Sequence, residues 1–272
     1  MVLLFIFKSF VLLTYKILKM NNFLYTVSFL LIFVSCKKDK PLVPLTVEKE
    51  SKTINDACKQ DECAEITLNY LIASGNEEAS EKVNRVIEDF IIQSLNISED
   101  SLYVPKSIEE ATSNFIKIYK RDKSEYPDMG VYFAEVSVNE MYSSPSILSL
   151  EKNAYLYTGG AHGYGATSYS NFDAQTGEPL KMDELIKDKN GFLALAEEKF
   201  RTENEIPEGE PINATGFWFE NDTFYLPESF GISPEELIFV YNQYEIASYA
   251  AGPIEFRIPI KEAEPFLRLN LK

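Results

Sequence analysis

The stretch SILSLEKNAYLYTGGAHGYGATSYSNF, residues 146–172, marks the part of the chain from which strands are expected to predominate. Two short apolar segments, 146–150 and 153–158, predict a β-hairpin that leads into the glycine-rich segment 159–163. Residues 168–172 predict the next strand, and Thr176-Gly177 predicts the turn after it. We therefore expect an antiparallel sheet in this region.

Strands and helices alternate before this stretch. Apolar residues repeat at helical spacing after Asn76 and again after Ser107, which predicts two helices. Ser107 and Glu110 have the spacing of a capping box at the start of the second helix. Pro127 predicts the end of the second helix, and Gly130 leads into the next strand. The strands expected here cover residues 46–54, 64–71 and the positions around Ala134, Val136 and Val138.

Behind the central stretch, Asn190 is expected to cap a helix that runs to Phe200. Three further strands are expected near residues 223–226, 236–241 and 254–258. The whole pattern predicts an α+β fold with two packed α/β lobes, whose mostly antiparallel sheets carry helices on one face.

The composition indicates a folded protein with an acidic surface. Of the 272 residues, 45% are hydrophobic and 13% aromatic, which is ample material for a packed core. The formal net charge is −16. Such a charge repels phosphate backbones and attracts cationic partners, so we expect no nucleic-acid partner. Solubility alone is the alternative explanation of the charge.

Residues 1–35 are expected to be a signal peptide of the lipoprotein type. The apolar run 23–34 ends at Ser35-Cys36 and is followed at once by lysines. It is shorter than the roughly 20 residues that a membrane-spanning helix needs. We expect cleavage before Cys36 and transfer of a diacylglycerol to its thiol, with palmitate among the acyl chains of the lipid. The lipid would anchor the chain to a membrane of the cell envelope, on the periplasmic side or at the cell surface.

Residues 1–19 look redundant ahead of this signal, so we expect the true start at Met20, or at Leu18 read as an alternative start codon. Phe33 departs from the leucine that is usual three positions before the lipidated cysteine. An uncleaved membrane anchor over residues 1–35 is the alternative. Its lysines divide the apolar run into pieces too short to span a bilayer.

Residues 36–45 are expected to be a lipid-anchored tether, and the two remaining cysteines follow it. Cys58 and Cys63 enclose four residues. In an oxidising compartment so close a pair is most simply a local disulfide. A metal site would need more soft ligands, and the one histidine lies far away in sequence.

The sequence contains no G-x-S-x-G nucleophile elbow, no P-loop, no Rossmann glycine fingerprint and no H-E-x-x-H zinc helix. One histidine cannot supply a zinc site with two or three histidine ligands. We therefore expect no cofactor, no metal and no enzymatic activity. A pair of carboxylates for glycoside cleavage stays open, because 42 acidic residues offer too many candidates.

His162 has the most unusual setting, since Gly159, Gly160 and Gly163 let backbone approach it closely. One interpretation is a ligand-binding loop formed by His162, Gly159, Gly160 and Tyr164. The alternative, which we favour, is a buried histidine that pins a tight loop. The aromatic segment 216–219, which contains Trp218, could stack on sugar rings, but core packing is the simpler expectation.

Two blocks of sequence resemble a known domain family. The first runs YTGGAHG at 157–163 and FDAQTGEPL at 172–180, with DELI at 183–186; the second is NQYEIASYAAGP at 242–253 with Ile258-Pro259. They resemble the C-terminal domain of the RsiV type, named for an anti-sigma factor whose outer part binds lysozyme. Residues 45–142 resemble the smaller domain that normally precedes it, and the same pair stands before the catalytic domain of a peptidoglycan deacetylase.

The resemblance implies an N-terminal partner domain at 46–142 and an RsiV-like domain at 143–272. We expect neither the anti-sigma role nor the deacetylase activity, because the segments that carry them are not recognised here. What the resemblance implies is a noncatalytic binding module of the envelope. Its expected ligand is a cationic protein such as lysozyme, or a peptidoglycan or glycan fragment. A glycan hydrolase with paired carboxylates is the alternative.

Overall fold

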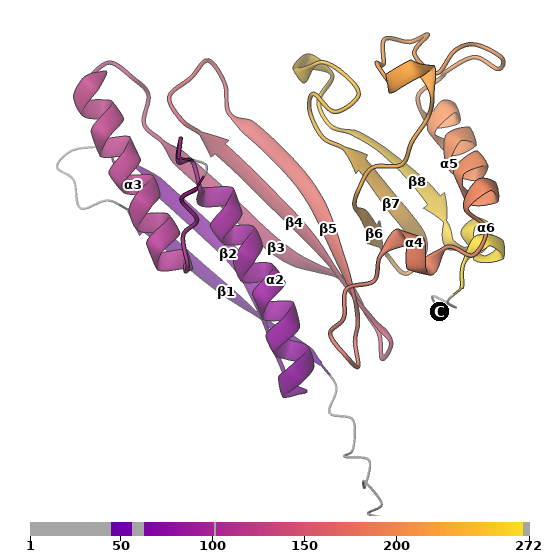
Figure 1. Cartoon of the computed structure of the whole chain (residues 1–272), viewed down its shortest axis with the longest axis horizontal. Helices are drawn as coiled ribbons and strands as arrows, with labels where there is room; N and C mark the ends of the chain where they lie inside the picture. The colour runs from indigo at the N-terminus through magenta and orange to yellow at the C-terminus, as the bar shows by residue number, and fades with distance from the viewer. Residues whose placement is uncertain (1–44, 56–62, 101, 269–272) are drawn as a thin grey trace, which may run out of the picture. The chain divides into compact units, whose positions relative to one another are not determined.

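The fold is built on a five-stranded sheet whose strands lie in chain order (Figure 1). Its strands are β1 (Thr46–Asn55), β2 (Glu65–Ser74), β3 (Phe133–Ser143), β4 (Ile147–Tyr157) and β5 (Tyr164–Asp173). Neighbouring strands are antiparallel except β2 and β3, which are parallel because two helices connect them. The computed structural model describes residues 45–55, 63–100 and 102–268, all within one compact unit, Val43–Lys272.

The two connecting helices, α2 (Glu77–Leu95) and α3 (Ile108–Glu125), begin where the sequence predicts. The Asn76 side chain accepts a hydrogen bond from the Ala79 amide, and the Ser107 side chain accepts one from the Glu110 amide. The Glu110 carboxylate accepts from the Lys106 amide rather than from Ser107, so the predicted capping box is only half formed. Both helices are amphipathic and pack over one face of the sheet.

The core beneath α2 and α3 uses every second residue of the strands. In β3, Ala134, Val136 and Val138 are buried as expected, while Glu135 between them is exposed. Phe115 of α3 is fully buried against them. Side-chain alternation therefore leaves the other face of this sheet uncovered by these helices.

The second sheet has three antiparallel strands, β6 (Phe230–Ile232), β7 (Glu236–Tyr241) and β8 (Ile254–Pro259). Helix α5 (Lys189–Glu203) packs on it, and the short helices α4 (Met182–Leu185) and α6 (Ile260–Ala263) flank it. Phe200 of α5 lies at the centre of its aromatic core. Five ring centroids lie between 5.1 and 5.8 Å from that of Phe200: Phe217, Phe219, Phe224, Tyr241 and Phe256.

Buried side chains of the large sheet hold the second sheet through its backbone. The Asn171 amide donates to the Phe230 carbonyl oxygen at 2.7 Å, and the Ser149 hydroxyl accepts from the Ile232 amide at 3.1 Å. Ser149 and Asn171 belong to β4 and β5 and point away from α2 and α3. Each bond satisfies a backbone group of β6 that water cannot reach.

The structure confirms the α+β fold with two mostly antiparallel sheets. Three local expectations were wrong. Residues 147–157 form the single strand β4 rather than a hairpin, because the half-buried Lys152 packs along Phe90, with its ammonium 5.0 Å from the centre of the Phe90 ring. The helix after residue 187 is capped by Asp188 instead of Asn190. A strand was expected at residues 223–226, but these residues lie outside the small sheet. Its remaining strand is β6, further along the chain.

The expected division between residues 142 and 143 falls inside β3, and β4 and β5 continue the same sheet beyond it. Cys36 and Cys58, the tether 36–44 and the expected signal peptide lie outside the described residues. Among the helices that are described, none combines the length and the apolar character needed to cross a membrane.

We expect Ser149→Ala to lower the free energy of unfolding by about 1 to 3 kcal/mol, because it leaves the Ile232 amide buried without an acceptor. Urea unfolding followed by circular dichroism measures the change. Ser170→Ala on β5 is the matched control, since no hydrogen bond of its hydroxyl is found in the described structure. Equal stability of the two variants would contradict this role of Ser149.

Candidate functional site

The face of the large sheet that α2 and α3 leave open carries a groove of about 600 Å³. Thr67 and Asn69 of β2 point into it, away from the helices that cover Ile66 and Leu68. Loop residues Gln243 and Pro253, which flank the second sheet, complete the wall. The described residues lining the groove are Thr67, Asn69, Glu135, Val136, Ser137, Asn153, Ala154, Tyr155, Gly165, Ala166, Thr167, Gln243 and Pro253.

Neutral polar groups dominate this lining. Glu135 is its one carboxylate among the described residues, and no lysine or arginine lines it there. The Thr167 hydroxyl donates to the Asn153 side-chain oxygen at 2.7 Å, which fixes both groups on the floor. The Gln243 side-chain oxygen is buried and has no hydrogen-bond partner among the described residues. The groove thus presents fixed hydroxyl and amide groups, and one acceptor without a partner among the described residues is buried in its wall.

Three aromatic rings form a ladder at the end of this face. The centre of the Phe133 ring lies 5.7 Å from that of Tyr155 and 5.6 Å from that of Tyr157, with interplanar angles of 27° and 29°. Tyr155 lines the groove and is 39% exposed. Stacking against Phe133 therefore holds an accessible tyrosine in a fixed orientation.

His162 lies in the loop between β4 and β5 and contacts the second lobe. Its ring stacks on Tyr249 with centroids 4.0 Å apart, and its Nδ1 lies 3.0 Å from the Gly163 carbonyl oxygen. The Tyr249 hydroxyl donates to the same carbonyl at 2.8 Å. Loop 158–163 is thereby fastened to loop 242–253, which carries the groove wall.

The expectation of a buried His162 was wrong, because its side chain is exposed. Gly159 has a φ of +78°, which favours glycine, and Gly160 is exposed. Tyr164 points to the opposite face of the sheet from Tyr155 and Gly165, so it does not line the groove. His162 therefore contacts the loop that carries the groove wall, but neither His162 nor Tyr164 is among the residues that line the groove.

Asn242 joins the two lobes directly beside the groove. Its side-chain oxygen accepts from the Thr167 amide at 2.7 Å, and its side-chain nitrogen donates to the Thr167 carbonyl oxygen at 3.0 Å. Both groups belong to the edge strand β5, so the amide satisfies backbone that would otherwise lack a partner strand. The position of Gln243 is set by this contact.

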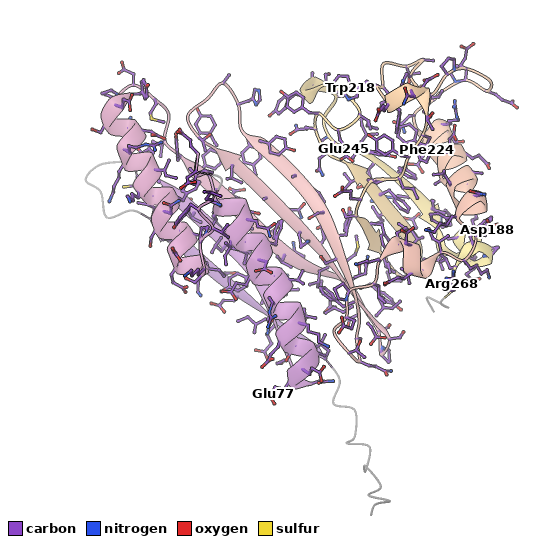
Figure 2. All side chains as sticks on the ribbon, viewed as in Figure 1. Glu77, Asp188, Trp218, Phe224, Glu245 and Arg268 are labelled. Carbon is purple, nitrogen blue, oxygen red and sulfur yellow. The ribbon has the colours of Figure 1, made fainter. Side chains whose placement is uncertain are left out.

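Trp218 is exposed rather than a core residue, although Phe219 beside it is buried. Figure 2 shows Trp218 near Glu245, and the indole nitrogen donates to the Glu245 carbonyl oxygen at 3.3 Å. The Trp218 ring is 47% exposed and lies outside the groove lining. The core expectation holds for Phe219 and not for Trp218.

A second hollow, of about 550 Å³, is lined by Asn242 and by Ser168 of β5. Glu228, Glu245 and Tyr225 are among its lining residues. Burial raises the pKa of the Glu245 carboxyl, and the nearby Glu228 raises it further, whereas a hydrogen bond from the Asn242 amide at 2.9 Å opposes these effects. Glu228 itself is exposed.

The pattern of the sequence singled out His162 but missed the groove. Groove residues such as Thr67, Ser137 and Asn153 are ordinary strand residues that lie far apart in the chain. Tyr249 and Gln243 belong to the block 242–253 that carried the family resemblance, which was the one available signal. No group of three or more His, Cys, Asp or Glu side chains in the described part of the chain could hold a metal ion.

We expect His162→Ala to change the free energy of unfolding by about 1 kcal/mol or less, because the ring is exposed and loses one stacking contact. Thermal unfolding measures this, with Tyr164→Ala on the opposite face as control. A larger loss of stability would assign His162 a purely structural role. Loss of ligand binding at an unchanged melting temperature would support a functional one.

Glu245→Gln is expected to stabilise the fold at about pH 7 relative to the unmodified chain, and this advantage should disappear at about pH 4. The folded-state pKa of Glu245 is raised, so the carboxyl favours folding only while it is protonated and loses that contribution as the pH rises through its folded pKa. Glutamine keeps an oxygen that can accept from the Asn242 amide. Urea midpoints at the two pH values measure the difference; a pH-independent difference would contradict the raised pKa.

Comparisons with known proteins agree with the fold. Residues 57–164 match the family model described as deacetylase PdaC, and residues 183–261 match the model described as protein of unknown function, DUF3298. A search of curated protein sequences found no relative.

Two solved structures are similar to this chain. A DUF3298 family member from Bacteroides fragilis is 20% identical, with a TM-score of 0.66, over 85% of this chain and 96% of that one. A DUF3298 family protein from Pseudomonas aeruginosa PAO1 is 18% identical, with a TM-score of 0.61, over 84% and 96%. The chain thus joins a segment similar to PdaC to a segment similar to the DUF3298 family, in a fold shared with DUF3298 structures.

Proposed function

We propose that this chain is a noncatalytic binding module of the cell envelope, anchored through a lipid on Cys36, and that the groove on the large sheet is its ligand site. The expected ligand is a cationic protein such as lysozyme, or a peptidoglycan or glycan fragment. The RsiV-type resemblance of blocks 157–163 and 242–253 supports a binding role of this kind.

The observation that carries the proposal is the chemistry of the groove. Its volume lies within the range of small-ligand sites, and its walls combine fixed polar groups with an accessible tyrosine. Glycoside hydrolysis needs two carboxyl groups that flank the scissile bond. Glu135 is the one carboxylate found in the described lining, which favours binding over cleavage at this place.

The envelope location is supported by the sequence before the folded unit. The apolar run 23–34, the Ser35-Cys36 junction and the lysines behind it are typical of a lipoprotein signal. Lipidation uses one of the three cysteines and leaves Cys58 and Cys63, which we propose form a disulfide. The tether 36–45 would hold the acidic body close to the bilayer.

The net charge of −16 supports a cationic protein as one ligand class, because opposite charge raises the rate of encounter. Attraction of this kind acts over the whole surface and is screened by salt. The net charge therefore affects the rate of association. It does not determine which residues contact the ligand.

A glycan hydrolase is the second candidate, and it would use the other hollow. Glu245 with its raised pKa and the nearby Glu228 have the contrast of environments that an acid and a base need. The variant Glu245→Gln decides between the binding module and the hydrolase. If the purified chain releases reducing ends from peptidoglycan and the variant does not, the hydrolase replaces the binding proposal.

We expect the chain from Lys37 onward to be retained at low salt on immobilised lysozyme or on insoluble peptidoglycan. Ser137→Trp, which fills the groove from β3, should reduce retention at least about tenfold. Ser113→Trp is the matched control and should be retained normally, because Ser113 is exposed on α3, which covers the opposite face of the sheet. Absence of retention on both matrices at low salt would overturn the proposal.

Repetition of this experiment at high salt separates two kinds of binding. Retention that salt abolishes, and that Ser137→Trp leaves unchanged, reports general charge attraction and contradicts the groove as the ligand site. Retention that survives salt and depends on Ser137 supports it.

A further inference from the structure

We infer that the groove binds an uncharged oligosaccharide chain, with Tyr155 as its stacking platform and Gln243 as a hydrogen-bond acceptor for the sugar. This inference rests on the proposed binding function and names the ligand class for that site. It follows from the ring ladder, the polar lining, the missing counter-charges and the place of the groove in the fold.

The ring ladder provides a fixed apolar surface inside a polar groove. Phe133 stacks between Tyr155 and Tyr157, so the accessible Tyr155 ring has little freedom left to lose on binding. A pyranose ring has one face made of C–H groups, which packs on an aromatic ring, and a rim of hydroxyl groups. Tyrosine suits such a ligand because its body is apolar and its tip is polar.

The polar lining matches the rim of a sugar. Hydroxyl groups of a glycan both donate and accept, as do the side chains of Thr67, Asn69 and Ser137, which line the groove. These three come from neighbouring strands of one rigid sheet, so their spacing is set before a ligand arrives.

Gln243 provides a further, independent indication of a ligand. A buried side-chain oxygen without a partner costs free energy, and such atoms are rare enough to require a reason. The Gln243 oxygen is in this state at the wall of the groove, beside the residue that fastens the loop. A sugar hydroxyl or amide N–H would satisfy it once the Gln243 side chain turns its oxygen toward the groove.

Charge selects an uncharged ligand. The chain carries a net charge of −16, yet the described lining holds one carboxylate, Glu135, and no lysine or arginine. An anionic polymer would find no cation there and would be repelled by the whole molecule. A cationic ligand could pair with one exposed carboxylate in the described lining, and an ion pair exposed to water contributes little binding free energy.

The position of the groove disfavours an extended peptide. Peptides that bind to sheets usually add a strand at a free edge, where main-chain hydrogen bonds supply the affinity. This groove lies on the face of the sheet, across β2 to β5, and its floor offers side chains. The Thr167 amide and carbonyl of the edge strand β5 are already bonded to Asn242.

The test is titration of the full chain, purified in detergent, with three tetrasaccharides by calorimetry. We expect the neutral tetramers of N-acetylglucosamine or of glucose to bind, and the cationic tetramer of glucosamine to bind at least about tenfold more weakly. Tyr155→Ala and Asn69→Ala should each weaken binding of the neutral sugar about tenfold. Asn69 is exposed, so its variant should keep the fold.

Tyr126→Ala is the control, because Tyr126 is 60% exposed and lies behind α3, outside the groove. Failure of both neutral tetramers to bind, tighter binding of the cationic tetramer, or full affinity in both groove variants would overturn the inference. If the chain is still retained on lysozyme or peptidoglycan in that case, the proposed binding function stands without a glycan in the groove.

Discussion

The rest of the structure depends on one kind of contact between the two lobes. Amide and hydroxyl side chains of one lobe form hydrogen bonds with backbone groups of the other. Ser149 and Asn171 bind the backbone of β6, and Asn242 returns the contact by binding both backbone groups of Thr167. Apolar packing alone would let two sheets slide, whereas these bonds have direction and a fixed register. Loop 242–253 therefore stands at one defined distance from the floor of the large sheet, and a groove exists between them.

The same constraint explains how an acidic protein keeps a nearly uncharged groove. The groove floor is the outer face of a sheet whose other face is buried under α2 and α3, so its residues alternate with core residues such as Ile66 and Val136. Threonine, serine and asparagine stand at these alternate positions in β2, β3 and β4, while most of the acidic residues lie elsewhere on the surface. Long-range attraction and local recognition are thus separate properties of this molecule: the net charge raises the rate of encounter, and the groove residues make the contact.

The sequence predicts what depends on local pattern and not what depends on contacts between distant segments. Helical spacing and caps placed α2 and α3 correctly, since Asn76 and Ser107 act on their own first turns. The polar run at 151–153 resembled a turn, but the contact of half-buried Lys152 with Phe90 and the hydrogen bond from Thr167 to Asn153 keep it in β4. The sequence predicted a buried His162 that holds a tight loop. It did not predict that the ring stacks on Tyr249, because Tyr249 lies far along the chain. The sequence did not predict the groove either, because its lining residues come from distant segments: strands β2 to β5 and a loop of the other lobe.

The segment 242–245 departs from ordinary local preferences in three ways at once. The buried side-chain oxygen of Gln243 has no partner in the described part of the chain, Tyr244 has a φ of +69°, and burial raises the pKa of the Glu245 carboxyl. Each departure costs free energy, and a turn without them would be simple to build with glycine or asparagine at the left-handed position. The turn is held in place by Asn242 on β5 and by the ring of Tyr249 on Tyr244 and His162. The surrounding contacts maintain this strain at the wall of the groove, which argues that the turn is shaped for a ligand and not for stability.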